Sequence, residues 1–226
     1  MKKLFCVFVV GMMVSPLLAQ TTKEEAILIE KKILSDAKRI GDPSVAAYSM
    51  YKLIALEGKN STYMDSLAYV YFSSRKYASS FLAANDVLER DPKNAEILEL
   101  KAISLESLGA IDKSSEVYAE LFALTNNNYH GYALSNLQFS MKKFEEAYAT
   151  IQKVESLNDS GKVKVTFTIN QNHTQQVELL AAIPYLKGVI EVELDKETEA
   201  KASFQKALKI QPDFVLAKEN FDAINK

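Results

Sequence analysis

The side chains that could carry out catalysis are few and scattered in this sequence of 226 residues. The two histidines, His130 and His173, lie in different segments and lack the spacing of a zinc-binding H-E-x-x-H motif. His130 follows closely on three asparagines, which predicts a turn residue rather than a metal ligand. No G-x-S-x-G motif, phosphate-binding loop or G-x-G-x-x-G motif is present. We therefore expect no enzyme, no cofactor and no metal site.

The charge of the chain gives no sign of a nucleic-acid or membrane-surface ligand. Lysine and arginine number 27 against 29 acidic residues, and loss of Lys2 and Lys3 with an N-terminal leader would leave a net charge of −4. No basic run is present that could bind phosphates or an anionic lipid surface. Acidic neighbours such as Glu145 and Glu146 fall at expected helix starts, where they favour the helix dipole and face water. They do not indicate a catalytic carboxylate pair.

The first 19 residues have the features of a cleavable signal peptide. Two lysines precede an apolar run from Leu4 to Val14, and Ala19 offers a small residue for cleavage. The run is shorter than the about 20 apolar residues that span a bilayer, which disfavours a retained anchor helix. Cys6, the only cysteine, lies inside the run and is not placed as a lipidated first residue. We expect cleavage after Ala19 and an exported mature chain, periplasmic or secreted, with no disulfide and no membrane insertion.

Apolar residues recur first at helical spacing and then at a longer period. Leu98, Ala102, Leu105 and Leu108 follow one another at three and four residues, as in an amphipathic helix. When the apolar stripe of residues 61–94 is moved forward by 34 positions, five of six compared positions remain apolar or aromatic. The sequence therefore predicts repeated helical units rather than one irregular domain.

The stretch from Gly188 to Pro212 carries the clearest motif. Gly188 lies in one helical pattern, Ala200, Phe204 and Ala207 lie in a second, and Pro212 ends it. This order resembles the tetratricopeptide repeat (TPR), a helix–turn–helix unit of 34 residues. The resemblance implies a stack of such units, because one unit cannot bury its apolar face alone.

We therefore predict an all-α fold, a right-handed helical-repeat solenoid of TPR-like helix pairs with a small β-hairpin insertion near 162–179. Departures from the family pattern affect boundaries rather than architecture: no tryptophan begins a repeat, and Ser80 and Ser114 stand where the family prefers alanine. The predicted segments are a signal peptide at 1–19, repeats 1–4 within 20–158 (27–60, 61–94, 95–128 and 129–158), the insertion at 159–180, a fifth repeat at 181–214 and a capping helix at 215–226.

One segment breaks the helical period. Val154 and Ala207 occupy equivalent places in their repeats but are 53 positions apart, 19 more than one repeat. In residues 162–169, apolar side chains alternate with lysine and threonine, a period of two that is typical of a strand. The following Asn170-Gln-Asn172 is rich in turn formers. The segment therefore predicts a β-hairpin between the fourth and fifth helix pairs.

The apolar face of this hairpin admits two interpretations. A two-stranded ribbon is marginal alone, so the face must pack on something. In the simpler interpretation it covers the adjacent helices of its own chain. In the other, that face or the free strand edge docks a partner or a second copy; a disordered loop is the remaining alternative. The residues of this hairpin interface are Val163, Val165, Phe167 and Ile169.

The TPR resemblance also implies a groove, because the first helix of each pair usually lines the concave face in that family. Aromatic residues dominate the implied lining, and acidic residues group in its middle. Tyrosine offers wide contact area at small entropic cost, which suits peptide binding; any one of these tyrosines could instead pack between helices. The implied groove residues are Asp65, Tyr69, Phe72, Glu99, Ile103, Glu106, Tyr132, Asn136, Phe139, Tyr185, Val189 and Val192.

The implied function is a non-catalytic scaffold that holds a protein or peptide in this groove, within an assembly of the cell envelope. A TPR subclass binds the C-terminal carboxylate of chaperone tails with Lys, Arg and Asn. Here Asp65, Glu99 and Tyr132 occupy those stretches and only Asn136 fits that pattern. A peptide with apolar side chains, and basic ones facing Glu99 and Glu106, is the better match.

Two alternatives from other classes remain open. The hairpin and the C-terminal repeat could build a homo-oligomer, which would make the chain a self-associating structural component. The groove tyrosines could instead bind a glycan or peptidoglycan. The sequence does not name the partner under any of these hypotheses.

Overall fold

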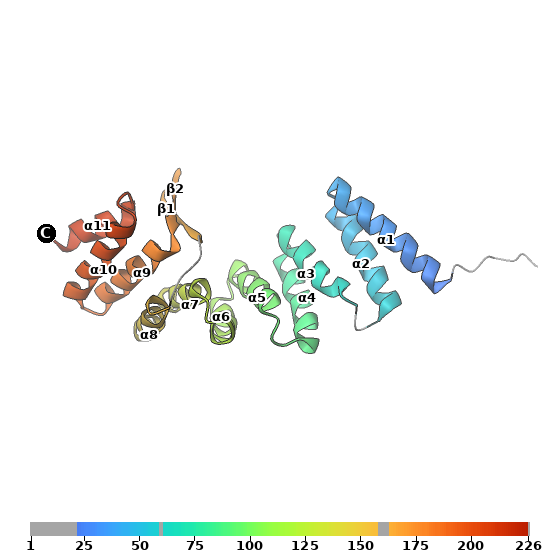
Figure 1. Cartoon of the computed structure of the whole chain (residues 1–226), viewed down its shortest axis with the longest axis horizontal. Helices are drawn as coiled ribbons and strands as arrows, with labels where there is room; N and C mark the ends of the chain where they lie inside the picture. The colour runs from blue at the N-terminus through green and yellow to red at the C-terminus, as the bar shows by residue number, and fades with distance from the viewer. Residues whose placement is uncertain (1–21, 59–60, 158–162, 226) are drawn as a thin grey trace, which may run out of the picture.

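The computed structural model describes residues 22–58, 61–157 and 163–225. The predicted signal peptide and the first residues of the predicted insertion, 159–162, lie outside them. In the described ranges, eleven helices and one two-stranded sheet follow one another along the chain (Figure 1). They are α1 (Lys23–Ile40), α2 (Pro43–Glu57), α3 (Tyr63–Ser73), α4 (Tyr77–Arg90), α5 (Ala95–Ser107), α6 (Ile111–Thr125), α7 (Asn128–Ser140), α8 (Phe144–Glu155), β1 (Lys164–Asn170), β2 (His173–Glu178), α9 (Leu179–Glu193), α10 (Glu197–Ile210) and α11 (Val215–Ile224).

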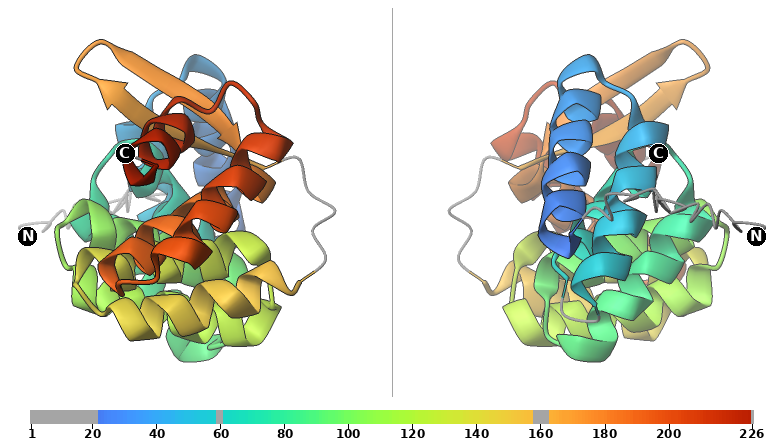
Figure 2. Two further views of the ribbon diagram at one scale, coloured as in Figure 1. Left: turned by 90° about the vertical axis from the view of Figure 1, so that its left-hand side faces the viewer. Right: turned by 90° about the vertical axis from the view of Figure 1, so that its right-hand side faces the viewer.

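The helices form five consecutive pairs, α1–α2 to α9–α10, and α11 packs on the last pair. Figure 1 shows the pairs laid along the long axis with the hairpin projecting near the C-terminal end, and the end views of Figure 2 show them winding around that axis. This confirms the predicted helical-repeat solenoid with an inserted hairpin. Two helices begin earlier than the predicted segments: α1 starts at Lys23, and α9 starts at Leu179, directly after β2.

The first helices of the pairs lie on the inner side of the curve. Helix α3 contacts α5, and α7 contacts α9, across the helix that separates each of them in sequence. On the opposite side an open groove separates the second helices α6 and α8. A stack whose first helices approach one another more closely than its second helices must bend toward the first helices. They therefore form the concave face.

The turn inside each pair places one residue in the left-handed backbone conformation at the same point of the repeat. Only glycine adopts this conformation without a steric cost to its side chain. The sequence uses glycine in two of the five turns and a larger residue in the other three. The residues are Gly41, Arg75, Gly109, Lys142 and Asp195, with φ values of 77°, 56°, 76°, 60° and 57°.

The structure explains the serines that depart from the family pattern. The buried Ser80 hydroxyl donates a hydrogen bond to the carbonyl oxygen of Ala68, at 3.1 Å. Ser114 donates in the same way to the carbonyl of Ala102, at 2.9 Å. Each bond joins the two helices of one pair across twelve residues of sequence. The small side chain required by close helix packing can therefore be polar, because its hydroxyl group has a partner.

The motif around Gly188 marks the closest approach of two helices in the fifth pair. A Cβ atom at this position would lie 2.7 Å from the ring of Phe204, which is closer than packed atoms allow. Ala200, Phe204 and Ala207 are fully buried in α10 against α9. The residues that carry the family resemblance are thus the contacts that hold this pair together.

Charged groups join the fourth and fifth pairs across the insertion. The carboxylate of Glu155, on α8, accepts hydrogen bonds from Lys187 on α9 and from Lys206 on α10, both at 2.7 Å. The buried Glu191 accepts a hydrogen bond from Ser203 at 2.6 Å, and its other oxygen lies 3.8 Å from Lys187. The helices that flank the insertion are therefore held together independently of the hairpin.

Strands β1 and β2 pair antiparallel, from Lys164 opposite Glu178 to Thr168 opposite Thr174. The apolar face of the hairpin packs on the C-terminal helices: the ring of Phe167 lies 5.4 Å from that of Tyr185 and 5.0 Å from that of Phe214, centre to centre. Val165 also packs against this core.

Two glutamine side chains fasten the hairpin to the turn between α10 and α11. Gln175 donates to the carbonyl oxygen of Asp213 at 2.7 Å and accepts from the Val215 amide at 3.0 Å. The second bond caps the N-terminus of α11, whose own N-cap residue provides no side-chain hydrogen bond. Gln211 accepts from the amide of Glu178 at 3.0 Å and donates to the carbonyl of Gln176 at 3.3 Å. Strand β2 is therefore held along its outer edge.

Candidate functional site

A cavity of about 500 Å³ opens on the concave side between the hairpin and the first helices. Five successive residues of β1 form one wall, and no residue of β2 contributes. The opposite wall comes mainly from α7, with one residue each from α5 and α6. The lining residues are Glu106, Tyr118, Tyr129, Tyr132, Ala133, Asn136, Lys164, Val165, Thr166, Phe167 and Thr168.

Strand β1 presents its unpaired edge to this cavity. The amide of Leu179 donates to the carbonyl oxygen of Val163 at 2.9 Å, and the register then directs the peptide groups of Val165 and Phe167 toward β2. The amides and carbonyls of Thr166 and Thr168 consequently point away from β2. On the matching outer edge of β2, Gln211 binds the amide of Glu178 and the carbonyl of Gln176. Of the two edges of the hairpin, one is thus occupied and the other faces the cavity.

Three tyrosines converge on the cavity from α6 and α7. Tyr118 and Tyr132 are buried and Tyr129 is half-buried. Burial raises the pKa of each of these phenols above its ordinary value, so all three remain protonated hydroxyl groups at neutral pH. In the described part of the chain, none of the three hydroxyl groups has a hydrogen-bond partner. They are available to a ligand as donors and acceptors beside broad apolar rings.

Acidic groups lie beside these tyrosines. Surrounding protein partly desolvates the carboxyl group of Glu106, which raises its pKa. Glu99 lies about two turns earlier on α5, with its carboxylate 3.8 Å from Nε2 of His130. Among the described residues Glu106 has no ion-pair partner, while Lys164 on the β1 wall is the cation that lines the cavity. The helical wall is therefore negative, and a cationic group would be its electrostatic complement.

The cavity brings together part of the predicted site. Glu106, Tyr132 and Asn136 from the predicted groove meet Val165 and Phe167 from the predicted hairpin interface. The sequence predicts these as two separate surfaces. The structure joins them because the hairpin folds over the concave face of α7.

Other predicted groove residues lie elsewhere or have partners of their own. Tyr69 is 42% exposed and donates to Glu96 at 3.1 Å, and Asp65 pairs with Arg90. Tyr185 belongs to the aromatic cluster under the hairpin and accepts from Asn220 at 3.3 Å. Two further groove residues pack against aromatic rings of the following helix: Phe72 against Tyr77, and Phe139 against Phe144. The last three are Ile103 and Val189, which are partly buried, and Val192, which is exposed. In the hairpin, Ile169 is partly buried and Val163 is 39% exposed.

Two cavity tyrosines are absent from the sequence-based site. Tyr129 lies in the first turn of α7, one turn before Tyr132, so the spacing of three could have placed both on one helix face. Tyr118 lies on α6, a second helix, and the rule that first helices line the groove excludes it. It reaches the cavity because its large side chain passes between α5 and α7, where it is 1% exposed.

His130 is not the turn residue that the asparagine run predicts. Asn126 ends α6 and Asn127 caps α7, so His130 falls in the first turn of α7 and is buried. Its Nδ1 lies 2.8 Å from the hydroxyl of Thr125. No cluster of three or more metal-ligating side chains occurs in the ranges that the structure covers.

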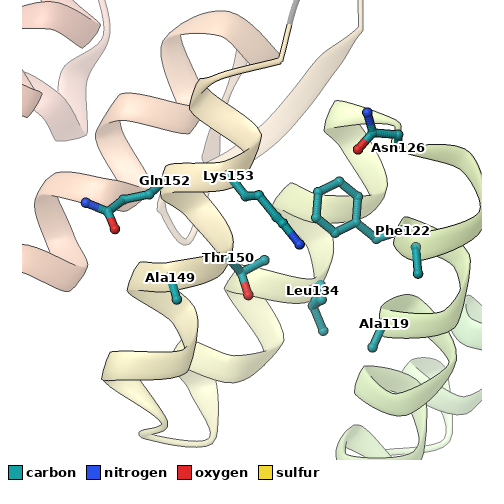
Figure 3. A pocket seen from close by; sticks show the side chains of 9 residues that line it. Ala119, Phe122, Asn126, Leu134, Ala149, Thr150, Gln152 and Lys153 are labelled. Atoms are coloured by element: carbon teal, nitrogen blue, oxygen red, sulfur yellow. The ribbon is translucent and has the colours of Figure 1, made fainter.

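A second hollow, of about 730 Å³, lies on the opposite face between α6 and α8. Figure 3 shows Lys153 extending from α8 across it toward Phe122 on α6, with the small side chains of Ala119 and Ala149 on its two sides. It is an open groove between successive second helices. Because polar groups do not converge in it as they do beside β1, the concave cavity is the stronger candidate site.

Stacked helix pairs with a concave face of first helices define the class of helical-repeat solenoid proteins. Within that class the sequence profile of the tetratricopeptide repeat matches residues 183–214. The match covers most of the fifth helix pair, α9–α10, so this pair is a TPR by sequence as well as by structure. No curated protein matches the sequence, and in the described residues no helix is long and apolar enough to cross a membrane.

Solved structures with the same fold share little sequence with the chain. One is MamA 41-end from Desulfovibrio magneticus RS-1, with a TM-score of 0.63, 13% identity, and coverage of 85% of this chain and 99% of that one. Another is YrrB, described as a TPR protein with an unusual peptide-binding site, with a TM-score of 0.64, 16% identity, and coverage of 88% and 91%. A further crystal structure of MamA gives 0.58 and 18% identity over 70% and 82%. These similarities establish the fold.

Proposed function

We propose that the chain is a non-catalytic scaffold that binds a protein partner through a peptide segment held in the concave cavity between β1, α5 and α7. The observation that carries this proposal is the cavity itself, where three tyrosine hydroxyl groups, a carboxylate and an unpaired strand edge converge. Such a set of groups suits peptide groups and side chains better than a reacting centre, because it contains no histidine, cysteine or serine beside a base. YrrB, whose fold is similar and which has an unusual peptide-binding site, adds support by analogy of fold alone.

The proposed location is the cell envelope. It rests on the charged start, the apolar run and the small residue at Ala19 of the sequence. The mature protein would then meet its partner outside the cytoplasm. Detection of the chain in periplasmic or culture fractions, with an N-terminus at Gln20, is the measurement that tests this part.

Self-association through the hairpin has less support than partner binding. Phe167 and Val165 pack on the chain's own C-terminal helices, and Gln211 occupies the outer edge of β2. Light scattering over a range of concentrations separates the two hypotheses, since a monomer at all concentrations contradicts self-association.

The test of the scaffold function is partner capture with a blocked cavity. Asn136 is exposed and lines the cavity, so Asn136→Arg would fill it without disturbing the core. Gln152→Arg is the matched control, because Gln152 is exposed and lines the groove on the opposite face. Tagged mature protein is cross-linked in envelope fractions and its partners are identified by mass spectrometry. We expect one dominant partner that is lost with Asn136→Arg and kept with Gln152→Arg; a partner retained by both variants contradicts a role for the cavity.

A further inference from the structure

The outer edge of β1 and the cavity beside it form one continuous surface. The same five residues, 164–168, provide both the unpaired strand edge and a wall of the cavity. A segment that paired with this edge would become the third strand of the sheet, and its alternate side chains would point toward the helices or toward solvent. A side chain directed to the helices would enter the space lined by Tyr118, Tyr129 and Tyr132.

The chemistry of that space selects the side chain. Glu106 carries a carboxylate at the rim with no ion-pair partner among the described residues, and the charges of both Glu106 and Glu99 act on Tyr118 and Tyr129. Aromatic rings and carboxylates together bind an ammonium or guanidinium group by cation–π attraction and charge-assisted hydrogen bonds. Lys164 lies on the strand wall, opposite Glu178 in the hairpin. Its charge repels a second cation near the start of β1, while the wall that carries the tyrosines remains negative.

The occupied edge of β2 shows why the partner must use β1. Gln211 binds one outward group on each of two β2 residues, the amide of Glu178 and the carbonyl of Gln176, while the outward groups of Thr166 and Thr168 have no partner among the described residues. Sheet edges of soluble proteins are usually covered or blocked. Here one edge is covered by the chain itself, and the other is left open over a cavity.

We propose that the protein binds an extended peptide segment as a third strand along β1, with an arginine or lysine side chain of that segment seated among the three tyrosines and Glu106. This proposal rests on the proposed scaffold function and names the chemical class of its partner. The proposal has two parts, strand pairing and recognition of a cationic side chain, and a separate variant tests each part.

Two pairs of variants separate edge pairing from charge recognition. Thr166→Pro removes an outward amide of β1 and keeps the backbone hydrogen bonds to β2, although it also removes the hydroxyl group that accepts from the Gln176 side chain at 2.7 Å. Thr174→Pro makes the same backbone change on the other edge. Glu106→Gln removes the charge at the cavity rim and keeps its shape, and Glu120→Gln does so on an exposed part of α6. Circular dichroism of each variant checks that the helical fold is intact.

The probe is a displayed library of random nonapeptides, selected on the mature protein. We expect enriched peptides with one arginine or lysine at a fixed position and with β-branched neighbours. Their affinity should fall about tenfold with Thr166→Pro and with Glu106→Gln, which corresponds to about 1.4 kcal/mol for each, and stay unchanged in the two controls. Replacing the basic residue of a selected peptide by citrulline or norleucine should weaken binding by a similar factor.

A second readout reports the pairing directly. The amides of Thr166 and Thr168 should become protected from hydrogen exchange when a selected peptide binds, while that of Thr174 should not. The proposal is overturned if no peptide is enriched, if enriched peptides lack a basic residue, or if Thr166→Pro and Glu106→Gln leave binding unchanged. If a cellular partner is still lost with Asn136→Arg in any of those cases, the scaffold function stands and only the strand-and-cation mode fails.

Discussion

The two ends of the helical stack differ in how the terminal helix pair is covered. At the N-terminal end, α1 leaves apolar side chains in solvent: Leu28 is 67% exposed and Ile40 is 66% exposed. At the C-terminal end, α11 and the hairpin cover the last pair, and Phe214 and Ala217 are fully buried. A repeat cannot bury both of its faces alone, so a terminal pair needs an additional element to cover it. Within the described residues, the chain provides that element at one end only.

This difference predicts that stability is concentrated at the C-terminal end. Replacing Phe214 by alanine opens a cavity beneath the hairpin and should lower the free energy of unfolding by about 3–5 kcal/mol. Leu28→Ala, at an exposed site of α1, should change it by less than about 0.5 kcal/mol. Urea denaturation followed by circular dichroism measures both, and equal losses at the two sites would contradict the asymmetry.

The second-largest difference is expected in how much an ion pair at each end contributes to the free energy of unfolding. Burial alone would raise the pKa of Glu155, but hydrogen bonds and the charges of Lys187 and Lys206 outweigh it and hold the pKa below 4.5. Glu155→Gln should cost about 1.5–3 kcal/mol at pH 7. The counterpart at the other end is Glu30→Gln, since Glu30 has Lys52 alone at 2.7 Å and a second oxygen that is buried without a partner among the described residues. We expect Glu30→Gln to cost less.

The pKa of Glu155 also predicts how the free energy of unfolding should change with pH. A carboxyl group whose folded-state pKa is lowered stabilises the fold above its unfolded pKa, near 4.5, and loses that contribution as the pH falls through the folded value. Glu191, whose pKa is raised mainly by burial and in smaller part by the charge of Glu155, acts in the opposite direction. It is still present in the variant, without the contribution from Glu155. The free energy of unfolding should therefore fall less steeply on acidification below pH 4.5 in Glu155→Gln than in the wild type. Parallel curves would show that Glu155 does not provide the dependence.

A smaller difference in stability cost is expected between removing a helix cap that is distant in sequence and removing a local one. Gln175 caps α11 from 40 residues away and also binds the Asp213 carbonyl. Gln175→Ala should cost about 1–2 kcal/mol, since it removes two hydrogen bonds, and should expose the hairpin to proteolysis. Asp42→Ala, which removes the cap next to α2, should cost about 1 kcal/mol without a change in the hairpin. Gln176→Ala is the control on the exposed face of β2, and equal proteolysis of all three variants would argue against fastening by Gln175.

The smallest expected effect concerns the turns of the terminal pairs. Gly41 turns the first pair with φ of 77°, and Asp195 turns the last with φ of 57°. Asp195→Gly should stabilise the fold by about 0.5 kcal/mol, because glycine relieves the left-handed strain. Gly41→Ala should destabilise it by about 1 kcal/mol, although its added Cβ would meet nothing within 4 Å. Thermal unfolding measures both shifts, and shifts of the same sign would rule out backbone strain as the cause.

The sequence predicts the stack and the hairpin because both depend on short-range patterns. The period of 34 residues, the alternation through Val165 and Phe167 and the packing triad of Ala200, Phe204 and Ala207 can each be found within one or two elements. Ser80 and Ser114 are departures from a family pattern in sequence, and their role becomes clear only with the partner carbonyls in place.

The site depends on where the hairpin lies, and that position cannot be read from periodicity. Its contacts with the C-terminal helices rest on single side chains such as Gln175 and Gln211, which have no distinctive pattern in sequence. The rule that first helices line the groove places Tyr185 in it, because α9 is a first helix, yet the hairpin covers this residue. The same rule excludes Tyr118 because α6 is a second helix, yet its ring reaches the concave side.

The distant cap of α11 also sets an order of events during synthesis. Gln175 finds its partners at Asp213 and Val215, so the hairpin cannot be fastened until nearly the whole chain has been made. Until then, Val165 and Phe167 lack the Phe214 side of their packing surface, and both edges of the ribbon are open. Incomplete chains that end before residue 213 would thus carry an uncovered apolar strand pair, a feature that favours aggregation and recognition by chaperones or proteases.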